Sequence, residues 1–349
     1  MTSATPAIQP RSDVMRRCAI VIGALAVFAL GRMAPLPGVD MDAARATSAR
    51  LGLPGDLFTI FSIGVTPIVS SALLLELVQL VFPSLRALCA TSSRAATRLR
   101  RIWLVMSLVF AAMQAHGIAG GMLGLDGLVP ETDGFVWTIV VTIVGATALL
   151  FWLSAFVSAA GYGDGLWLLY AAAYVGGLVR LFSSPLEQLG IGAGGESEMS
   201  AVLVALAIAV VALAALFLRT NQGTARERVE TFVWPAMIGF YGAGMLVNVL
   251  RFFLDAPAAY GPVHMGLVFL LILAVAFLRE GSTQVRMGAP RVLLLVVAET
   301  AICVIVGVAA RQAALPFGLE APGLVATIAA IAGLASSMRD SLRKPATTP

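Results

Sequence analysis

Residues 58–85 read FTIFSIGVTPIVSSALLLELVQLVFPSL, and this stretch decides the fold of the chain. It is longer than the roughly 20 apolar residues that a helix needs to cross a bilayer, since each residue adds about 1.5 Å. Gly64 and Pro67 lie near its start, Glu76 interrupts it, and Pro83 ends it. A bilayer tolerates helix breakers only where neighbouring helices or a water-filled cavity satisfy the freed backbone groups. The stretch therefore predicts a membrane-spanning helix that lines a protein interior.

The composition of the whole chain agrees with a membrane protein. Of its 349 residues, 59% are hydrophobic and 12% are charged, whereas a soluble globular protein has roughly 25% charged residues. The three cysteines stand far apart, and the two histidines are too few and too separated to suggest a metal site. The sequence shows no Ser/His/Asp set, metal-ligand cluster or phosphate-binding loop. We therefore expect neither an enzyme nor a bound cofactor or metal.

Ten apolar segments occur in the chain, and we expect each to cross the membrane once. They cover residues 18–30, 61–82, 102–122, 136–157, 166–182, 201–218, 233–253, 265–277, 292–310 and 324–338. With both termini in the cytoplasm, 17 of the 23 basic residues fall on the cytoplasmic side, and the outer loops collect acidic residues. A miscounted span would invert every later loop, so this bias supports ten spans. It also explains the net charge of +4 without a nucleic-acid partner.

Two prolines suggest internal symmetry. Pro67 lies near the outer start of the second segment, and Pro235 lies near the cytoplasmic start of the seventh. The two segments are five places apart in the order along the chain, which is an odd number, so the prolines approach the midplane from opposite sides, as in an inverted repeat. Chance is the rival explanation. The predicted organisation is a disordered cytoplasmic N-terminus (1–13), an N-terminal half (14–182), an outer hinge loop (183–200), a C-terminal half (201–340) and a cytoplasmic tail (341–349).

Five short motifs occur in order along the chain. They are Arg16-Arg17 before the first segment with LPGVD (36–40) after it, the second segment itself (60–85), QAHGIA (114–119), FWL (151–153) followed by GYGDG (161–165), and VWPA (233–236). Together they resemble the SecY family, the channel subunit of the bacterial protein translocase. The match is strong over residues 16–178 and faint after that, and it is specific because all five motifs are in order.

The resemblance implies an all-α polytopic membrane protein with ten transmembrane helices in two pseudo-symmetric five-helix halves around an hourglass pore. An apolar ring is implied to seal the pore, because a narrow apolar throat excludes water yet has no hydrogen bonds to break when a chain enters. A lateral gate is implied between the second and seventh segments. The ring residues carried over are Val65, Val69, Tyr170, Met237 and Ala326, and the gate residues are Pro67, Glu76 and Pro235.

Three residues of this set, and Glu299 outside it, draw particular expectations. Tyr170 departs from the aliphatic ring pattern and Ala326 is small, so we expect a lopsided ring in which the tyrosine covers for the alanine. Glu76 stands where the resemblance places a glutamine, and we expect it to weaken closure of the gate; the alternative is a snorkelling or protonated carboxylate. Glu299 in the ninth segment is expected to be an internal hydrogen-bonding residue.

The chain also departs from the family pattern. The segment after Asp40 is shorter and lacks the family's plug sequence, so residues 52–58 form a reduced plug or none. The cytoplasmic loops 219–230 and 279–291 are cut to turns, and residues 154–160 replace charges with Ser, Ala and Phe. The resemblance implies a SecE-like subunit and allows a SecG-like one, whereas the short loops disfavour the usual docking of SecA or the ribosome. Cytoplasmic partner contacts are expected at Arg98, Arg100, Arg101, Arg226, Arg228 and Arg286.

Three functions follow as hypotheses. The first is a SecY-like channel in the bacterial inner membrane that translocates or laterally inserts polypeptides. The second is a non-conducting paralogue that acts as a membrane-protein chaperone, insertase or assembly partner. The third and weakest is an inverted-repeat small-molecule transporter, with Glu76 and Glu299 as proton sites.

Overall fold

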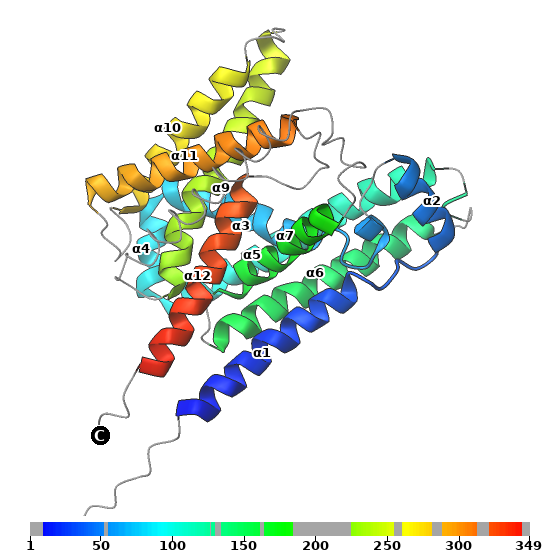
Figure 1. Cartoon of the computed structure of the whole chain (residues 1–349), viewed down its shortest axis with the longest axis horizontal. Coiled ribbons are helices and arrows are strands. Elements are labelled where there is room, and N and C mark those ends of the chain that lie inside the picture. The colour runs from blue at the N-terminus through cyan, green and yellow to red at the C-terminus, as the bar shows by residue number, and fades with distance from the viewer. Residues whose placement is uncertain are drawn as a thin grey trace, which may run out of the picture.

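The computed structural model describes residues 10–51, 55–125, 127–129, 134–160, 164–183, 225–254, 260–280, 288–312 and 321–343. Long helices overlap the predicted apolar segments in these ranges, which confirms the all-helical class (Figure 1). The sixth predicted span and nearly all of the hinge loop lie outside the described residues. The long helices are α1 (Pro10–Gly31), α3 (Thr66–Val81), α5 (Ser93–Leu123), α6 (Phe135–Ala159), α7 (Gly165–Ser183), α9 (Ala225–Leu254), α10 (Tyr260–Glu280), α11 (Ala289–Gln312) and α12 (Ala321–Arg343).

Two predicted boundaries differ from the structure. Helix α1 begins at Pro10 rather than at residue 14, because proline suits the first turn of a helix, where its missing N–H is not needed. Residues 10–13 are therefore helical, and residues 1–9 lie outside the described ranges. At the other end, α12 continues to Arg343, beyond the expected end of the C-terminal half at residue 340.

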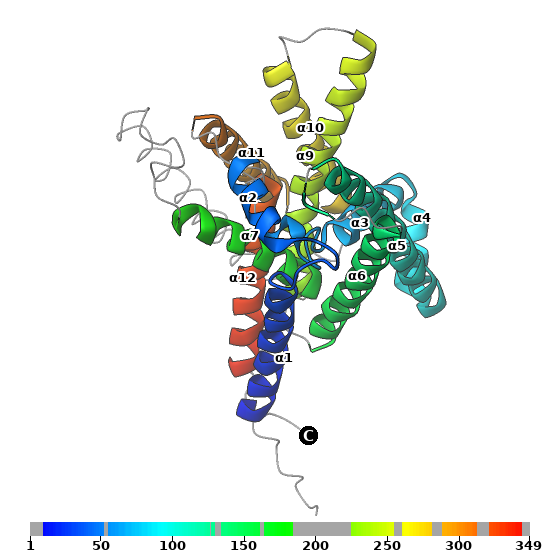
Figure 2. The same cartoon turned by 90° about the vertical axis from the view of Figure 1, so that its right-hand side faces the viewer.

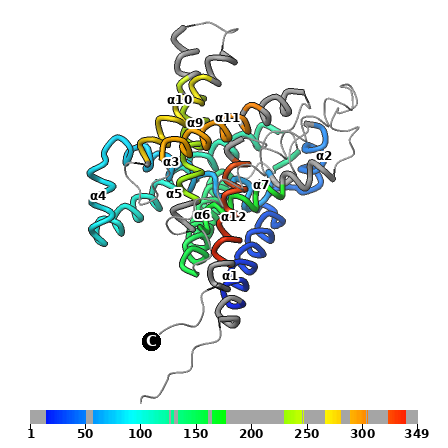
Figure 3. The backbone as a smooth tube through the Cα atoms, turned by 60° about the vertical axis from the view of Figure 1, so that its left-hand side comes forward, coloured from blue at the N-terminus to red at the C-terminus, as the bar shows by residue number. Residues whose placement is uncertain are grey.

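Three short helices were not predicted from the apolar pattern. They are α2 (Met41–Leu51), η1 (Gly55–Phe58) and α4 (Pro83–Thr91). Asp40 caps α2, because its Oδ1 accepts hydrogen bonds from the N–H groups of Asp42 (2.8 Å) and Ala43 (3.1 Å). Helix α4 starts at Pro83 and turns by 105° from α3. Figures 1 and 3 show α2 and α4 at opposite ends of the molecule.

The core is shared by helices that are far apart in the chain. Helix α12 packs against α7 and α9, α9 packs against α10, and α3 contacts α5, α9 and α10. Figure 2 shows α12 running beside α1, and these two helices also contact each other. By length and composition, α5 and α6 can each cross a membrane in the part of the chain that the structure describes, and α3 with α4 forms a third, bent candidate.

Helices α9 and α10 approach each other closely at Gly239. A Cβ there would overlap the Ile272 side chain and lie 3.2 Å from both the Ile272 backbone nitrogen and the Val268 carbonyl oxygen. We expect Gly239→Val to destabilise the protein by about 1–3 kcal/mol, since backbone atoms cannot yield as a side-chain tip can. The thermal midpoint in detergent would show this as a clear decrease. Gly266→Val in α10 is the control, because nothing lies within 4 Å of a Cβ there; equal losses in both variants would contradict the expectation.

Candidate functional site: an apolar waist and a charged cluster

Helix α3 starts later than the apolar run that contains it. Gly64 adopts a positive φ of 51°, which favours glycine, and a turn over residues 60–65 leads into the helix at Thr66. Pro67 thus falls in the first helical turn, where proline removes no intrahelical hydrogen bond. The predicted segment began at residue 61, whereas the helix begins at Thr66, so Gly64 precedes the helix and Pro67 lies in its first turn. By contrast, Pro235 lies inside α9 and is buried.

The expected ring residues come from four helices and contact one apolar core. Four of them are buried within that cluster, and Tyr170 of α7 is half-buried and packs against it. We call these five residues the waist: Val65, Val69, Tyr170, Met237 and Ala326. Val65 precedes the first residue of α3, Val69 lies in its first turns, Met237 lies in α9 and Ala326 lies in α12.

A cavity of about 190 Å³ borders the waist at the start of α3. Val65 and Tyr170 both line it, so α3 and α7 meet at this cavity. Arg32, which the charge pattern placed in an outer loop, also lines it and donates from Nη1 to the Ala173 carbonyl oxygen at 3.1 Å. The other lining residues are Phe28, Phe61, Ser62, Ile63, Gly64, Thr66, Ala173 and Tyr174.

The described part of the expected plug segment does not line this cavity. Residues 55–58 form η1, and Phe58 is buried in a second apolar cluster with residues of α5 and α6 such as Ala119 and Ile139. The Phe58 carbonyl oxygen accepts a hydrogen bond from the Leu36 N–H at 2.9 Å, which ties the segment to the chain after α1. Two tyrosines of α7, Tyr170 and Tyr174, line the cavity instead, and both lie against α12.

Gly323 makes this α7–α12 contact close. A Cβ at Gly323 would lie 2.5 Å and 2.6 Å from atoms of the Tyr174 ring and 3.5 Å from the Tyr170 hydroxyl oxygen. Tyr170 also packs edge-on against Trp167, which itself meets Trp234 of α9 with ring centroids 5.3 Å apart. Aromatic side chains thus connect α7 with α9 and α12 beside the waist.

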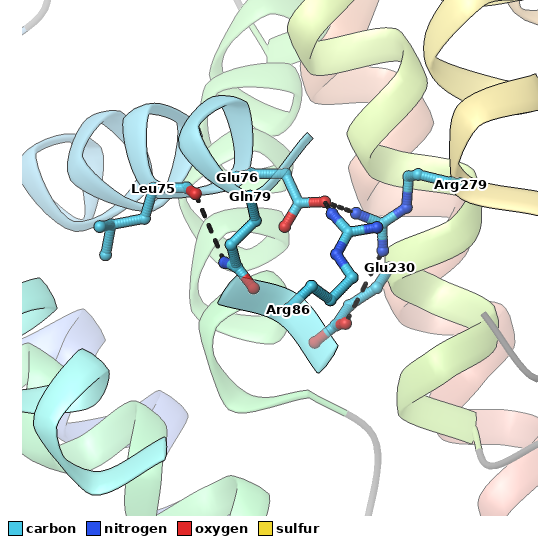
Figure 4. A network of polar contacts seen from close by, with 6 residues as sticks. All are labelled: Leu75, Glu76, Gln79, Arg86, Glu230 and Arg279. Carbon is cyan, nitrogen blue, oxygen red and sulfur yellow. Dashed lines mark hydrogen bonds and ion pairs between the residues drawn. The ribbon is translucent and has the colours of Figure 1, made fainter. Parts of the chain in front are cut away.

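Four charged residues meet where α3, α4, α9 and α10 come together (Figure 4). Glu76 Oε1 accepts from Arg86 Nη2 at 2.6 Å and also from Arg279 Nη1. Arg279 Nη2 lies 4.0 Å from Glu230 Oε2. We call Glu76, Arg86, Glu230 and Arg279 the charged cluster. Gln79, one turn after Glu76, donates instead to the Leu75 carbonyl oxygen of its own helix at 3.4 Å.

The charged cluster contains two acidic and two basic side chains, and these are mostly buried. The exposed side-chain fractions are 5% for Arg279, 11% for Glu76, 17% for Arg86 and 28% for Glu230. Burial lowers the pKa of Arg86, and the Glu230 carboxylate acts against that shift. A buried charge is costly unless it is paired and hydrogen-bonded, so two acids and two bases at one place satisfy each other.

Glu76 was singled out from the sequence, but its partners were not. Arg86 and Arg279 are only two of the 17 basic residues that the charge pattern assigns to the cytoplasmic side, whereas Arg279 lies in the last turn of α10 and is buried. A signal was available: a carboxylate in an apolar helix needs a cation, and both arginines follow apolar segments that end on the same side. The packing of α3 against α10 selects Arg279, and the 105° turn from α3 into α4 brings Arg86 to Glu76.

The remaining candidate residues are more scattered. Arg98, Arg100 and Arg101 are exposed in the first turns of α5. Arg226 and Arg228 lie in the first turn of α9, although their side chains lie outside the description, as does Arg286 altogether. Glu299 is fully buried in α11, and neither of its carboxylate oxygens has a hydrogen-bond partner among the described residues, contrary to the expectation of an internal hydrogen bond. The described residues contain no group of acids, His or Cys that could hold a metal ion.

Long apolar helices around a shared apolar core define an all-helical membrane protein, and comparisons with known proteins place its fold. The SecY family model matches residues 59–230, from the turn before α3 to the start of α9. SecY, the protein translocase subunit of Haemophilus influenzae, is 29% identical over 235 residues, which is 63% of this chain and 52% of that relative. Its counterpart in Escherichia coli K12 is 28% identical over 226 residues, 60% of this chain and 51% of the relative. The chain thus spans about half the length of the curated relatives it matches.

Comparisons with solved structures also indicate a fold similar to that of SecY and Sec61 channels. A structure described as a protein-conducting channel has a TM-score of 0.55 at 11% identity, covering 93% of this chain and 91% of its own. A SecY structure on the role of the plug domain has a TM-score of 0.54 at 12% identity, with 94% and 92% covered. Canine Sec61 in a ribosome–channel complex has a TM-score of 0.52 at 11% identity, with 93% and 91% covered. These comparisons confirm the resemblance of this chain to SecY.

Proposed function

We propose that this SecY-like protein is a protein-conducting channel that translocates polypeptides across the bacterial inner membrane or releases them laterally into it. The observation that carries the proposal is the waist: four apolar residues from α3, α9 and α12 buried in one cluster, with Tyr170 of α7 packed against it. An apolar throat of this kind holds back water and ions while it is closed, and it offers no polar group that must be broken when a chain enters.

The proposed architecture is that of ten spans in two five-helix halves, with both termini in the cytoplasm. The described helices α1–α7 supply the first half and α9–α12 most of the second. The positive charge on alternate loops supports the orientation. In this arrangement, the seam between α3 and α9 faces lipid and forms the lateral gate.

We assign the charged cluster to closure of this gate. Its members come from both proposed halves, since Glu76 and Arg86 belong to α3 and α4 whereas Glu230 and Arg279 belong to α9 and α10. Opening the seam separates the Glu76 carboxylate from Arg279. Glu76 was expected to weaken closure, but its ion pairs favour the opposite role, a contact that holds the two halves together.

The same ion pairs weigh against a proton-coupled transporter. The Glu76 carboxylate already binds two guanidinium groups from two other helices, so its contacts are those of an ion pair that joins helices. We propose neither proton coupling nor catalysis for this protein. The proposed partners are unfolded polypeptides, a SecE-like subunit and a SecG-like subunit. Exposed Arg98, Arg100 and Arg101 offer a cytoplasmic contact surface, while the short loops leave little for SecA or a ribosome to bind in the usual way.

Site-specific photo-crosslinking tests the proposed channel. A photoreactive residue at Val69 is expected to form adducts with a hydrophobic signal segment that is stalled during membrane insertion. Val105 in α5 is the matched control, because this valine is 60% exposed on the outer face of its helix, away from the waist. Adducts at Val69 well above those at Val105 support a channel. Equal yields, or no adduct with any secretory or membrane segment, would exclude passage through the waist.

A further inference from the structure

Three polar side chains form a hydrogen-bonded network between α3 and α5, which pack side by side (Figure 2). Ser71 Oγ of α3 and Ser107 Oγ of α5 lie 2.7 Å apart, and Trp103 Nε1 of α5 donates to the Ile68 carbonyl oxygen of α3 at 3.1 Å. We call Ser71, Trp103 and Ser107 the polar clamp. Two of its hydrogen bonds cross from one helix to the other, so the network joins α3 to α5.

The polar clamp is buried, and its hydrogen bonds satisfy one another. Ser71, Ser107 and Ile68 are each 0% exposed. Each hydroxyl also lies near a carbonyl oxygen of its own helix, Ser71 near that of Ile68 at 2.9 Å and Ser107 near that of Trp103 at 2.8 Å. Since a hydroxyl has one proton, one serine donates to the other, and the second donates to the carbonyl oxygen of its own helix. Both arrangements keep the Trp103 bond, and Phe151 of α6 packs edge-on against the Trp103 ring with centroids 4.8 Å apart.

The first turn of α3 needs support from outside, because it has no side-chain cap. Val65 stands at the N-cap position, and valine has no atom that accepts from the free N–H groups of a first turn. Val65 is also a waist residue, so a polar cap there would place a hydrogen-bonding group in the throat. The N–H groups of Ile68 and Val69 both donate to the Val65 carbonyl oxygen at 3.0 Å. A bond from α5 to Ile68 therefore supports both waist residues of α3 and adds no polar side chain to the waist.

We propose that the polar clamp positions Val65 and Val69 in the closed waist. Trp103, Ser71 and Ser107 act through the backbone of α3, so they are positioning residues and do not seal the throat themselves. When the bonds from α5 are lost, the first turns of α3 shift more often, and water reaches Val69. The inference rests on the proposed channel, in which the waist is the seal.

Thiol labelling of the purified full chain tests the polar clamp without any need for channel activity. Val69 is replaced by cysteine in a chain whose own three cysteines are changed to alanine, and the rate of alkylation by a water-soluble maleimide is measured. A buried thiol reacts only when a local opening exposes it, so the rate reports how well α3 is held. Trp103→Phe keeps an aromatic ring but removes the indole N–H. We expect it to raise the rate by roughly three- to twentyfold, the range for one hydrogen bond between membrane helices.

The serine variants give a signature that general loosening would not give. Ser71→Ala and Ser107→Ala remove the same bond between the helices, and the remaining hydroxyl keeps a carbonyl acceptor in its own helix. We therefore expect equal rate increases in the two single variants and no further increase in S71A/S107A. Adding Trp103→Phe removes the second bond between the helices, so the rate should rise again in the triple variant.

Ser154→Ala and Trp152→Phe in α6 are the matched controls. Ser154 is buried like the clamp serines, but its hydroxyl donates to the Phe151 carbonyl oxygen of its own helix at 2.9 Å. Trp152 is 58% exposed. Neither control should change the labelling rate. Unchanged labelling in W103F and S71A/S107A, or equal increases in the controls, would overturn the proposal.

Ion conductance in planar bilayers separates the polar clamp from the proposed channel. With Val69 intact, W103F/S71A should conduct ions although every waist residue is unchanged, whereas the two control variants should not. Fast labelling without conductance would support the polar clamp and contradict the waist as the ion seal. Conductance in Val69→Gly together with unchanged labelling in the clamp variants would support the seal and overturn the polar clamp.

Discussion

Glu76→Gln is expected to let the seam admit segments that the unaltered protein rejects. The change keeps the shape of the side chain but leaves Arg86 and Arg279 without their shared carboxylate. Breaking a buried ion pair by removing one partner typically costs about 3–5 kcal/mol, and Glu230 beside Arg279 offsets part of this loss. If about 2 kcal/mol of closure free energy is lost, segments with about four fewer leucines should enter, since each leucine contributes roughly 0.5 kcal/mol to insertion.

The measurement is the yield of Val69 crosslinks with a series of segments of rising leucine content. Arg279→Gln should give a smaller shift, because Glu76 keeps its 2.6 Å bond to Arg86. The double variant E76Q/R279Q should return toward the unaltered threshold, since it removes one charge of each sign. Asp42→Asn is the control: it breaks the ion pair with Arg45 on α2, whose side chains are 92% and 74% exposed, and such surface pairs contribute little. One threshold shared by all four variants would exclude a gate role for the charged cluster.

Val69→Gly is expected to make the closed protein permeable to ions. Removing a branched side chain from the waist widens and hydrates the throat, and the barrier to ions in an apolar constriction depends on its dryness. Purified protein in planar bilayers should show conductance at least about tenfold above that of the unaltered protein. Val140→Gly in α6 is a close control, because Val69 and Val140 are 6% and 8% exposed and the two substitutions remove the same atoms.

Gly323→Leu gives a second route to the same result. The new side chain would displace Tyr174 and Tyr170, which pack on Gly323 beside the waist. If these tyrosines complete a lopsided ring, this variant should leak although every aliphatic waist residue is intact. Leak in Val140→Gly equal to that in Val69→Gly would point to general instability. If neither Val69→Gly nor Gly323→Leu raises the ion conductance, the waist is not the seal.

Much of the helical framework could be predicted from the sequence. Apolar runs of membrane-spanning length predicted the long helices in the described ranges, because the bilayer requires each run to satisfy its own backbone hydrogen bonds. Their ends were less accurate: Pro10 starts α1 early, and Pro67 starts α3 late. Periodicity gave little warning of α2 or α4, since a short helix has too few apolar positions to show a pattern. Five ordered motifs were enough to indicate a SecY-like chain.

Sequence alone determined the class of protein, the apolar helices and the place of an ionisable Glu76 within one of them, because each follows from local composition and the thickness of a bilayer. Tertiary structure alone decided which cations bind Glu76 and which residues surround the cavity beside Val65. These contacts join residues as far apart as Glu76 and Arg279, and the spacing along a chain does not specify which helix ends meet. Charge balance required that Glu76 have a partner, and only the packing of α3 against α10 selected Arg279.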